Sequence, residues 1–122
     1  MKVLVLEGDP EVRISLVDLL EQIGGVTVRA EGRDLVASVS DILNEFQPEL
    51  VLMSWRDFRQ PMLARIKACT PTIPVWVFSA YSRKDIAREA KGAEEIFEKG
   101  DHWETDRLIR AISSMRDSCL HG

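Results

Sequence analysis

The segment Leu50–Asp57, which reads LVLMSWRD, indicates the class of fold more clearly than any other part of the sequence. Its first four residues are apolar without alternation, as expected of a strand that is buried on both faces of a parallel sheet. The apolar run stops at Ser54. Because open α/β sheets bind their ligands at the carboxyl ends of the strands, Ser54 is either an ordinary strand end or part of a functional site.

Four other short apolar runs predict strands, and segments with apolar residues at helical spacing separate them. The predicted strands are 3–6, 26–28, 50–53, 74–78 and 95–97. The predicted helices are 12–23, 35–46, 58–69, 82–90 and 101–115. Strands that alternate with helices predict βαβ units, and therefore an α/β fold in which helices cover both faces of a parallel sheet.

Capping signals support several of these helix boundaries. Asp9, directly before a proline, predicts the N-cap of the first helix, whose apolar face is expected to begin at Val12. Ser82 and Asp85 resemble a capping box for the fourth helix. Pro61 is compatible with the third helix only if it lies in the first turn.

The composition predicts one globular domain. The chain has 122 residues, of which 45% are hydrophobic and 30% are charged. This length suits a single hydrophobic core, which we place at residues 1–117, with a frayed tail at 118–122. The net charge of −4 argues against direct binding of nucleic acid, because phosphate neutralisation requires an excess of Lys and Arg.

Neither a membrane segment nor a disulfide framework is predicted. The apolar run at residues 3–6 is too short for a signal peptide or a membrane span. Cys69 and Cys119 lack the spacing of metal ligands, and two cysteines are typical of reduced thiols in a cytosolic protein. We therefore expect a soluble cytoplasmic domain.

Polar residues follow four of the predicted strands. They are Glu7-Gly8-Asp9, Ser54, Ser79-Ala80 and Glu98-Lys99-Gly100. Because the carboxyl ends of parallel strands meet at one edge of the sheet, we expect these residues to converge on one pocket.

Five motifs in the same order give the sequence its resemblance to the receiver domains of two-component response regulators. They are VLVLEGDPEVR at 3–13, VTVRAEG at 26–32, PELVLMS at 48–54, IPVWVFSAY at 73–81 and GAEEIFEKG at 92–100. The resemblance covers almost the entire chain. It implies a flavodoxin-like, doubly wound (βα)5 fold with a five-stranded parallel sheet in the order 2-1-3-4-5, and a role in phosphorelay signalling.

The resemblance also implies a role for each residue at the strand ends. In that family a carboxylate at the end of the third strand accepts the phosphoryl group, and Ser54 occupies this position. Acids after the first strand help to hold Mg²⁺, and here Glu7 is followed by Gly8 in place of the second acid. A hydroxyl and a lysine that contact the phosphoryl group correspond to Ser79 and Lys99.

These departures predict a degenerate receiver without a catalytic residue. Mg²⁺ prefers hard oxygen ligands in octahedral geometry, and the loss of two carboxylates makes its binding doubtful. We expect no metal site, with Glu7 and Asp9 as weak candidates and the Arg56 carbonyl as a further oxygen. A serine hydroxyl needs a neighbouring base to become nucleophilic, and no histidine is placed for this role.

Simpler structural roles compete with these functional ones. Asp9 is more readily explained as a helix cap than as a metal ligand. Ser79 either contacts an anion or terminates a strand. Lys99 either points into the pocket or, as we favour, forms an ion pair with Glu7 or Asp9. Trp55 either covers the pocket or a partner surface, or packs against the third helix.

The receiver family uses its fourth helix, fifth strand and fifth helix for output and dimerisation. The candidate residues of this face are Arg88, Lys91, Glu95, Trp103, Arg107 and Arg110. A solvated helix is the default interpretation of the mixed charges at 83–91.

The sequence thus favours a pseudo-receiver that signals by binding protein partners without phosphorylation, with homodimerisation through this face as one form of that binding. The alternatives are a sensor of small anions at the strand-end pocket and an atypical receiver that is still phosphorylated. An enzyme is least favoured, because the sequence has no Gly-rich phosphate loop, nucleophile elbow or His-centred triad.

Overall fold

The computed structural model describes residues 1–32, 38–56, 58–80, 82–98 and 102–121, without the side chains of 102–104 and 119–121. Strands and helices alternate throughout these residues. In chain order they are β1 (Lys2–Leu6), α1 (Pro10–Glu21), β2 (Thr27–Glu31), α2 (Val39–Phe46), β3 (Leu50–Ser54), α3 (Gln60–Cys69), β4 (Val75–Ser79), α4 (Arg83–Glu89), β5 (Glu95–Glu98) and α5 (His102–His121).

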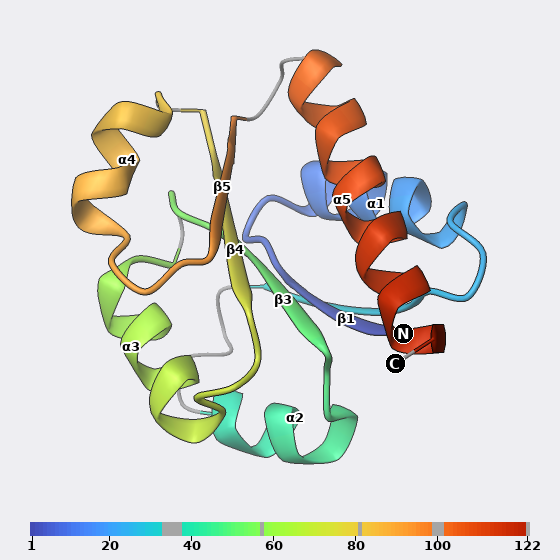
Figure 1. Cartoon of the computed structure of the whole chain (residues 1–122). Coiled ribbons are helices and arrows are strands. Elements are labelled where there is room, and N and C mark those ends of the chain that lie inside the picture. Colours follow the sequence, from blue (N-terminus) through green and yellow to red (C-terminus); the bar gives the residue numbers. More distant parts are fainter. Residues whose placement is uncertain (33–37, 57, 81, 99–101, 122) are drawn as a thin grey trace.

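The strands form one parallel sheet in the order β2-β1-β3-β4-β5, which confirms the predicted flavodoxin-like fold. The helices lie in two layers (Figure 1): α1 and α5 cover one face of the sheet, and α2, α3 and α4 cover the other. No helix in the described part of the chain is long and apolar enough to cross a membrane.

Alternate residues of the central strands supply two cores. Every residue of β3 and β4 is buried, as expected of parallel strands covered on both faces. Val51 and Met53 pack in the core beneath α2, α3 and α4, whereas Leu50 and Leu52 pack in the core beneath α1 and α5. Trp76 is buried in the second core.

The predicted caps form as expected. Asp9 Oδ1 accepts hydrogen bonds from the backbone N–H groups of Glu11 at 2.9 Å and Val12 at 3.3 Å. Ser82 Oγ accepts from Asp85 N at 3.3 Å and donates to Asp85 Oδ2 at 2.8 Å. These bonds satisfy N–H groups that have no partner within their own helix.

Two details differ from the sequence prediction. The third helix begins at Gln60, and Phe58 is a buried loop residue whose N–H donates to Ser54 O at 3.0 Å. Val12, expected on the apolar face of the first helix, has 36% of its surface exposed, whereas Leu20 of the same helix is buried. The backbone of residues 118–121 continues α5, and the expected fraying of this end stays a prediction.

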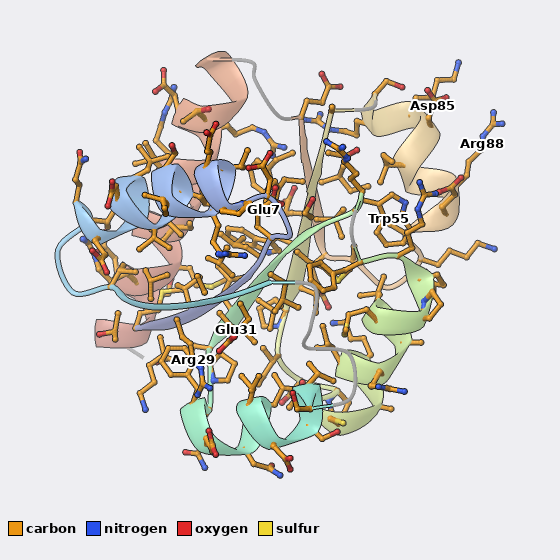
Figure 2. All side chains as sticks on the ribbon, turned by 180° about the vertical axis from the view of Figure 1, so that it is seen from behind. Glu7, Arg29, Glu31, Trp55, Asp85 and Arg88 are labelled. Carbon is orange, nitrogen blue, oxygen red and sulfur yellow. The ribbon has the colours of Figure 1, made fainter. Side chains whose placement is uncertain are left out.

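The edge strand β2 is tied to α2 by charged side chains. Arg29 Nε donates to Glu31 Oε1 at 3.1 Å, and Arg29 Nη1 donates to Glu45 Oε2 at 3.3 Å (Figure 2). The hydrogen bond that Arg29 donates to the Glu31 carboxylate is the main cause that raises the pKa of Arg29. These contacts join the edge strand β2 to α2 and are structural.

Candidate functional site

Glu7, Ser54 and Ser79 lie at the carboxyl ends of β1, β3 and β4. The register pairs Leu6 with Met53 and Ser54 with Phe78, so the three polar residues occur at adjacent positions on one edge of the sheet. They are also the buried polar residues among those described, with exposed fractions of 1%, 0% and 0%.

Backbone contacts hold Glu7 between β2 and α1. Its N–H donates to Glu31 O at 3.0 Å, and its carbonyl accepts from Arg13 Nη1 at 2.9 Å (Figure 2 shows Glu7 near the start of α1). Gly32 makes room for this arginine, since a Cβ at Gly32 would lie 2.6 Å from Arg13 Nη1. Sequence reasoning did not assign a role to Arg13.

Burial limits the chemistry that Ser54 can perform. Within the described residues, no buried side-chain nitrogen or oxygen lacks a hydrogen-bond partner, and Ser54 itself takes part in further interactions. Its hydroxyl is therefore closed to solvent and already engaged.

The surrounding oxygen ligands do not fit a Mg²⁺ ion. Asp9 is exposed, and its carboxylate caps α1, so the cap interpretation is confirmed. Among the described residues, no group of three or more His, Cys, Asp or Glu side chains is arranged to hold a metal. In the part of the chain that the structure describes, Glu7 alone supplies a buried carboxylate, whereas Mg²⁺ requires several hard oxygen ligands.

Lys99 and Asp57 lie outside the described residues. The ion pair expected between Lys99 and either Glu7 or Asp9 therefore stays a prediction. Ser79 ends β4 and is fully buried, which agrees with its role as a strand end and does not test contact with an anion.

Trp55 packs inside the protein and ties the loop after β3 to two other elements. Its exposed fraction is 1%, and it belongs to the core cluster that contains Met62 and Leu63 of α3. Its N–H donates to Phe78 O at 3.0 Å, and its indole Nε1 donates to Glu89 Oε2 of α4 at 3.0 Å. Packing against the third helix is thus confirmed, while the bond to Glu89 was not foreseen.

A cavity of about 210 Å³ opens beside this hydrogen bond. It is lined by Trp55 and Arg59 on the side of α3, and by Asp85, Ile86 and Glu89 on the side of α4. Figure 2 shows Trp55 between the sheet and α4, with Asp85 on the outer helix.

Arg107, a residue of the predicted output face, makes its contacts within the protein. Arg107 Nη2 donates to Ile96 O at 2.5 Å, Arg107 Nη1 lies 3.3 Å from Glu95 Oε2, and the guanidinium lies 4.0 Å from the centre of the Phe97 ring. Only 26% of the Arg107 side chain is exposed. Arg107 therefore stabilises the packing of α5 on β5. A charge reversal at Arg107 would disturb this packing as well as any binding of a partner.

The other residues of this face differ in accessibility. Arg88 is exposed in the last turn of α4, Lys91 is exposed just after this helix, and Arg110 is exposed on α5. The side chain of Trp103 is outside the described part of the structure.

Solved structures with the same fold include several receiver domains. A two-component response regulator of the LuxR family from Aurantimonas superposes with a TM-score of 0.80 at 20% identity, over 96% of this chain and 85% of that chain. The signal receiver domain of a DNA binding response regulator from Colwellia psychrerythraea gives 0.78 at 21% identity, over 96% and 98%. The N-terminal domain of a protein from Wolinella succinogenes gives 0.77 at 22% identity, over 99% and 98%.

The similarity is one of structure, since no family model and no curated protein matches the sequence. The five-stranded order, the alternating helices and the coverage of these superpositions agree along the whole chain. The chain therefore has the flavodoxin-like fold of response-regulator receiver domains.

Proposed function

We propose that this chain is a receiver-like signalling domain that acts by binding protein partners, without phosphorylation at the strand-end site. The observation that carries the proposal is Ser54, which ends β3 as a fully buried hydroxyl where the resembled family has its acceptor carboxylate. The likeness of the fold to receiver domains supports the signalling role.

The chemistry of the site supports the absence of phosphotransfer. A hydroxyl is a weak nucleophile unless a neighbouring base activates it. Metal-assisted transfer to this site would also need hard oxygen ligands around Mg²⁺, and the described residues provide no such group. No cofactor is part of the proposal.

The contacts of Trp55 suggest how such a domain works without a phosphoryl switch. In the loop after β3, the backbone N–H of Trp55 donates a hydrogen bond to Phe78 O of β4, and its indole N–H donates one to Glu89 of α4. A ligand shifts a two-state equilibrium only by its differential affinity for the two states. With the phosphoryl ligand lost, these bonds keep α4 in one position, and signalling depends on the presence of the partner.

The proposed partner is a protein in a cytoplasmic signalling pathway. A second copy of this chain is one such partner. Exposed Arg88 of α4, Lys91 just after that helix and Arg110 of α5 supply the accessible charge of the candidate face. Aromatic side chains and arginines are frequent at such interfaces.

The test is incubation with Mg²⁺ and acetyl phosphate, followed by mass spectrometry of the intact protein. The wild-type chain should show no added phosphoryl group. The matched positive control is the double variant Gly8→Asp/Ser54→Asp, which restores both missing carboxylates and should become phosphorylated. Stoichiometric modification of the wild-type chain that disappears in Ser54→Ala would refute the proposal.

A further inference from the structure

Helix α1 carries an acidic stripe, formed by Glu11, Asp18 and Glu21. All three residues are exposed, and none of their carboxylates forms a hydrogen bond or an ion pair in the described part of the chain. They share one face of the helix, because neighbours at three or four positions lie side by side. Ile14 lies on the same face between them, with 61% of its surface exposed.

The stability of α1 does not account for two of these acids. The partial negative charge at the carboxyl end of a helix disfavours carboxylates in the last turn. Asp18 and Glu21 nevertheless lie in the last turn of α1, which has no basic residue. They are also three positions apart, where like charges repel each other. A cationic partner would relieve both unfavourable interactions.

Helix α4 and the residue pair that follows it carry a basic stripe, formed by Lys84, Arg88 and Lys91. All three are exposed, and their side chains form no hydrogen bond or ion pair within the residues that the structure describes. Arg88 suits the last turn of α4, but Lys84 lies in the first turn, where a cation is unfavourable. Ala87, exposed on the same side, is small enough to leave room for an apolar side chain.

The two stripes lie on opposite sides of the molecule. Helix α1 packs on one face of the sheet and α4 on the other (Figure 1). Figure 2 shows Arg88 pointing outward from α4, on the side away from α1. The stripes therefore cannot meet within one molecule, although they can meet between two.

The charge of the whole chain is divided in the same way. Residues 56–91, which include α3 and α4, contain eight of the 16 Lys and Arg residues but only three of the 20 Asp and Glu residues. This segment therefore has a net charge of +5 in a chain of net charge −4, and the remainder has a net charge of −9. Such a distribution attracts the positive side of one molecule to the negative side of another.

We propose that the acidic stripe of α1 binds the basic stripe of α4 on a second copy of this chain, with Ile14 packed near Ala87. The contact is head-to-tail, so each copy keeps one stripe of each kind for a further copy. The inference rests on the proposed function, since it names one protein partner of that domain and the surfaces that bind it. Arg110 of α5 takes no part in the contact.

The contact is expected to be weak and sensitive to salt. Two single helices bury less surface than the roughly 1,200 Å² at which stable interfaces begin. Exposed charges act over ~30 Å at about 0.01 M salt but only over ~3 Å at about 1 M. Self-association should therefore be measurable at low salt and absent at high salt.

Sedimentation velocity of the whole chain, at rising protein concentration, is the first measurement. At about 0.01 M salt the mean mass should rise with concentration through dimers to larger species, because a head-to-tail contact leaves both ends open. At about 1 M salt the mean mass should stay that of a monomer.

Charge-reversed variants locate the two surfaces. Asp18→Lys and Arg88→Glu should each weaken self-association about tenfold, because an attraction becomes a contact between like charges. The matched controls are Asp41→Lys on α2 and Arg110→Glu on α5, which change the net charge equally at exposed positions. Each control should change self-association by less than about twofold.

A mixture of two neutralised variants tests whether the stripes bind each other. Asp18→Asn/Glu21→Gln keeps the basic stripe, and Lys84→Gln/Arg88→Gln keeps the acidic one. Each variant alone should remain a monomer. Their equimolar mixture should form a heterodimer of one copy each and nothing larger, because each copy retains one stripe. Formation of this heterodimer also shows that both variants are folded.

Four results would overturn the proposal. These are a wild-type chain that stays monomeric at low salt, self-association that persists at high salt, an equal loss in the control variants, and a mixture of neutralised variants that stays monomeric. None of them alters the proposed absence of phosphorylation, which is measured by intact mass. Conversely, phosphorylation of the wild-type chain would remove the proposed function and leave the sedimentation result unchanged.

Discussion

The hydrogen bond from Trp55 to Glu89 provides the most direct test of how the loop after β3 is joined to α4. The substitution Trp55→Phe removes the indole N–H and part of a side chain that is 1% exposed. Glu89→Gln keeps an acceptor oxygen for the indole N–H, which donates at 3.0 Å, while Glu89→Ala removes it. The three variants separate packing from hydrogen bonding.

The expected cost follows from burial and geometry. The hydrogen bond contributes about 1 kcal/mol, at the lower end for a charged acceptor because half of the Glu89 side chain is exposed. The packing lost when the indole becomes a phenyl ring adds about 1 to 2 kcal/mol. Trp55→Phe should therefore destabilise the protein by about 2 to 3 kcal/mol, Glu89→Ala by about 1 and Glu89→Gln by less than about 0.5.

Urea denaturation followed by circular dichroism measures these differences through the transition midpoint at constant slope. In a double-mutant cycle, Trp55→Phe and Glu89→Ala should show a coupling of about 1 kcal/mol. Additive effects of the two substitutions would show that the bond does not join the loop to α4. A loss below about 0.5 kcal/mol in Trp55→Phe would refute the packing of the indole itself.

Three other predictions concern the site and the neighbouring face. Ser54→Asp alone should remain unphosphorylated by acetyl phosphate and Mg²⁺ in intact-mass measurements, because Gly8 still lacks a carboxylate; modification of this single variant would show a less degenerate site. Arg107→Ala should lower the free energy of unfolding by about 1 to 2 kcal/mol, through loss of its bond to the Ile96 carbonyl and its contact with Phe97, and Arg110→Ala by less than about 0.5. Equal losses would contradict the packing assigned to Arg107. In thermal-shift assays, phosphate, nucleotides and carboxylates should leave the melting temperature unchanged, whereas a ligand at ~100 times its dissociation constant would stabilise by about 2.7 kcal/mol and favour the anion-sensor alternative.

Local signals in the sequence were sufficient for the order and type of the elements. Apolar spacing distinguishes strands from helices, and the caps at Asp9 and Ser82 depend only on residues within the following turn. The first residue of α3 was predicted wrongly, because Phe58 fits the apolar pattern of the helix. Its side chain is buried in the core, but it belongs to the loop before α3.

The positions of Glu7, Ser54 and Ser79 at one edge were also predictable, because parallel strands place their carboxyl ends together. The residues that contact this site from other elements were not predictable. Arg13 reaches the Glu7 carbonyl only once α1 lies against the sheet over Gly32, and no local pattern identifies that contact. Similarly, the mixed charges around Arg107 are typical of a solvated surface, whereas in the structure its guanidinium lies over the Phe97 ring.

By itself, the sequence determined the α/β fold, the helix caps and the polar residues that end the central strands, since each depends on periodicity or on neighbours within a turn. The tertiary structure decided that Ser54 is buried, that the Trp55 indole donates a hydrogen bond to Glu89 of α4, and that a cavity opens beside this bond. These features join residues far apart in the chain, and only the packing of α3 and α4 against the sheet brings them within contact distance.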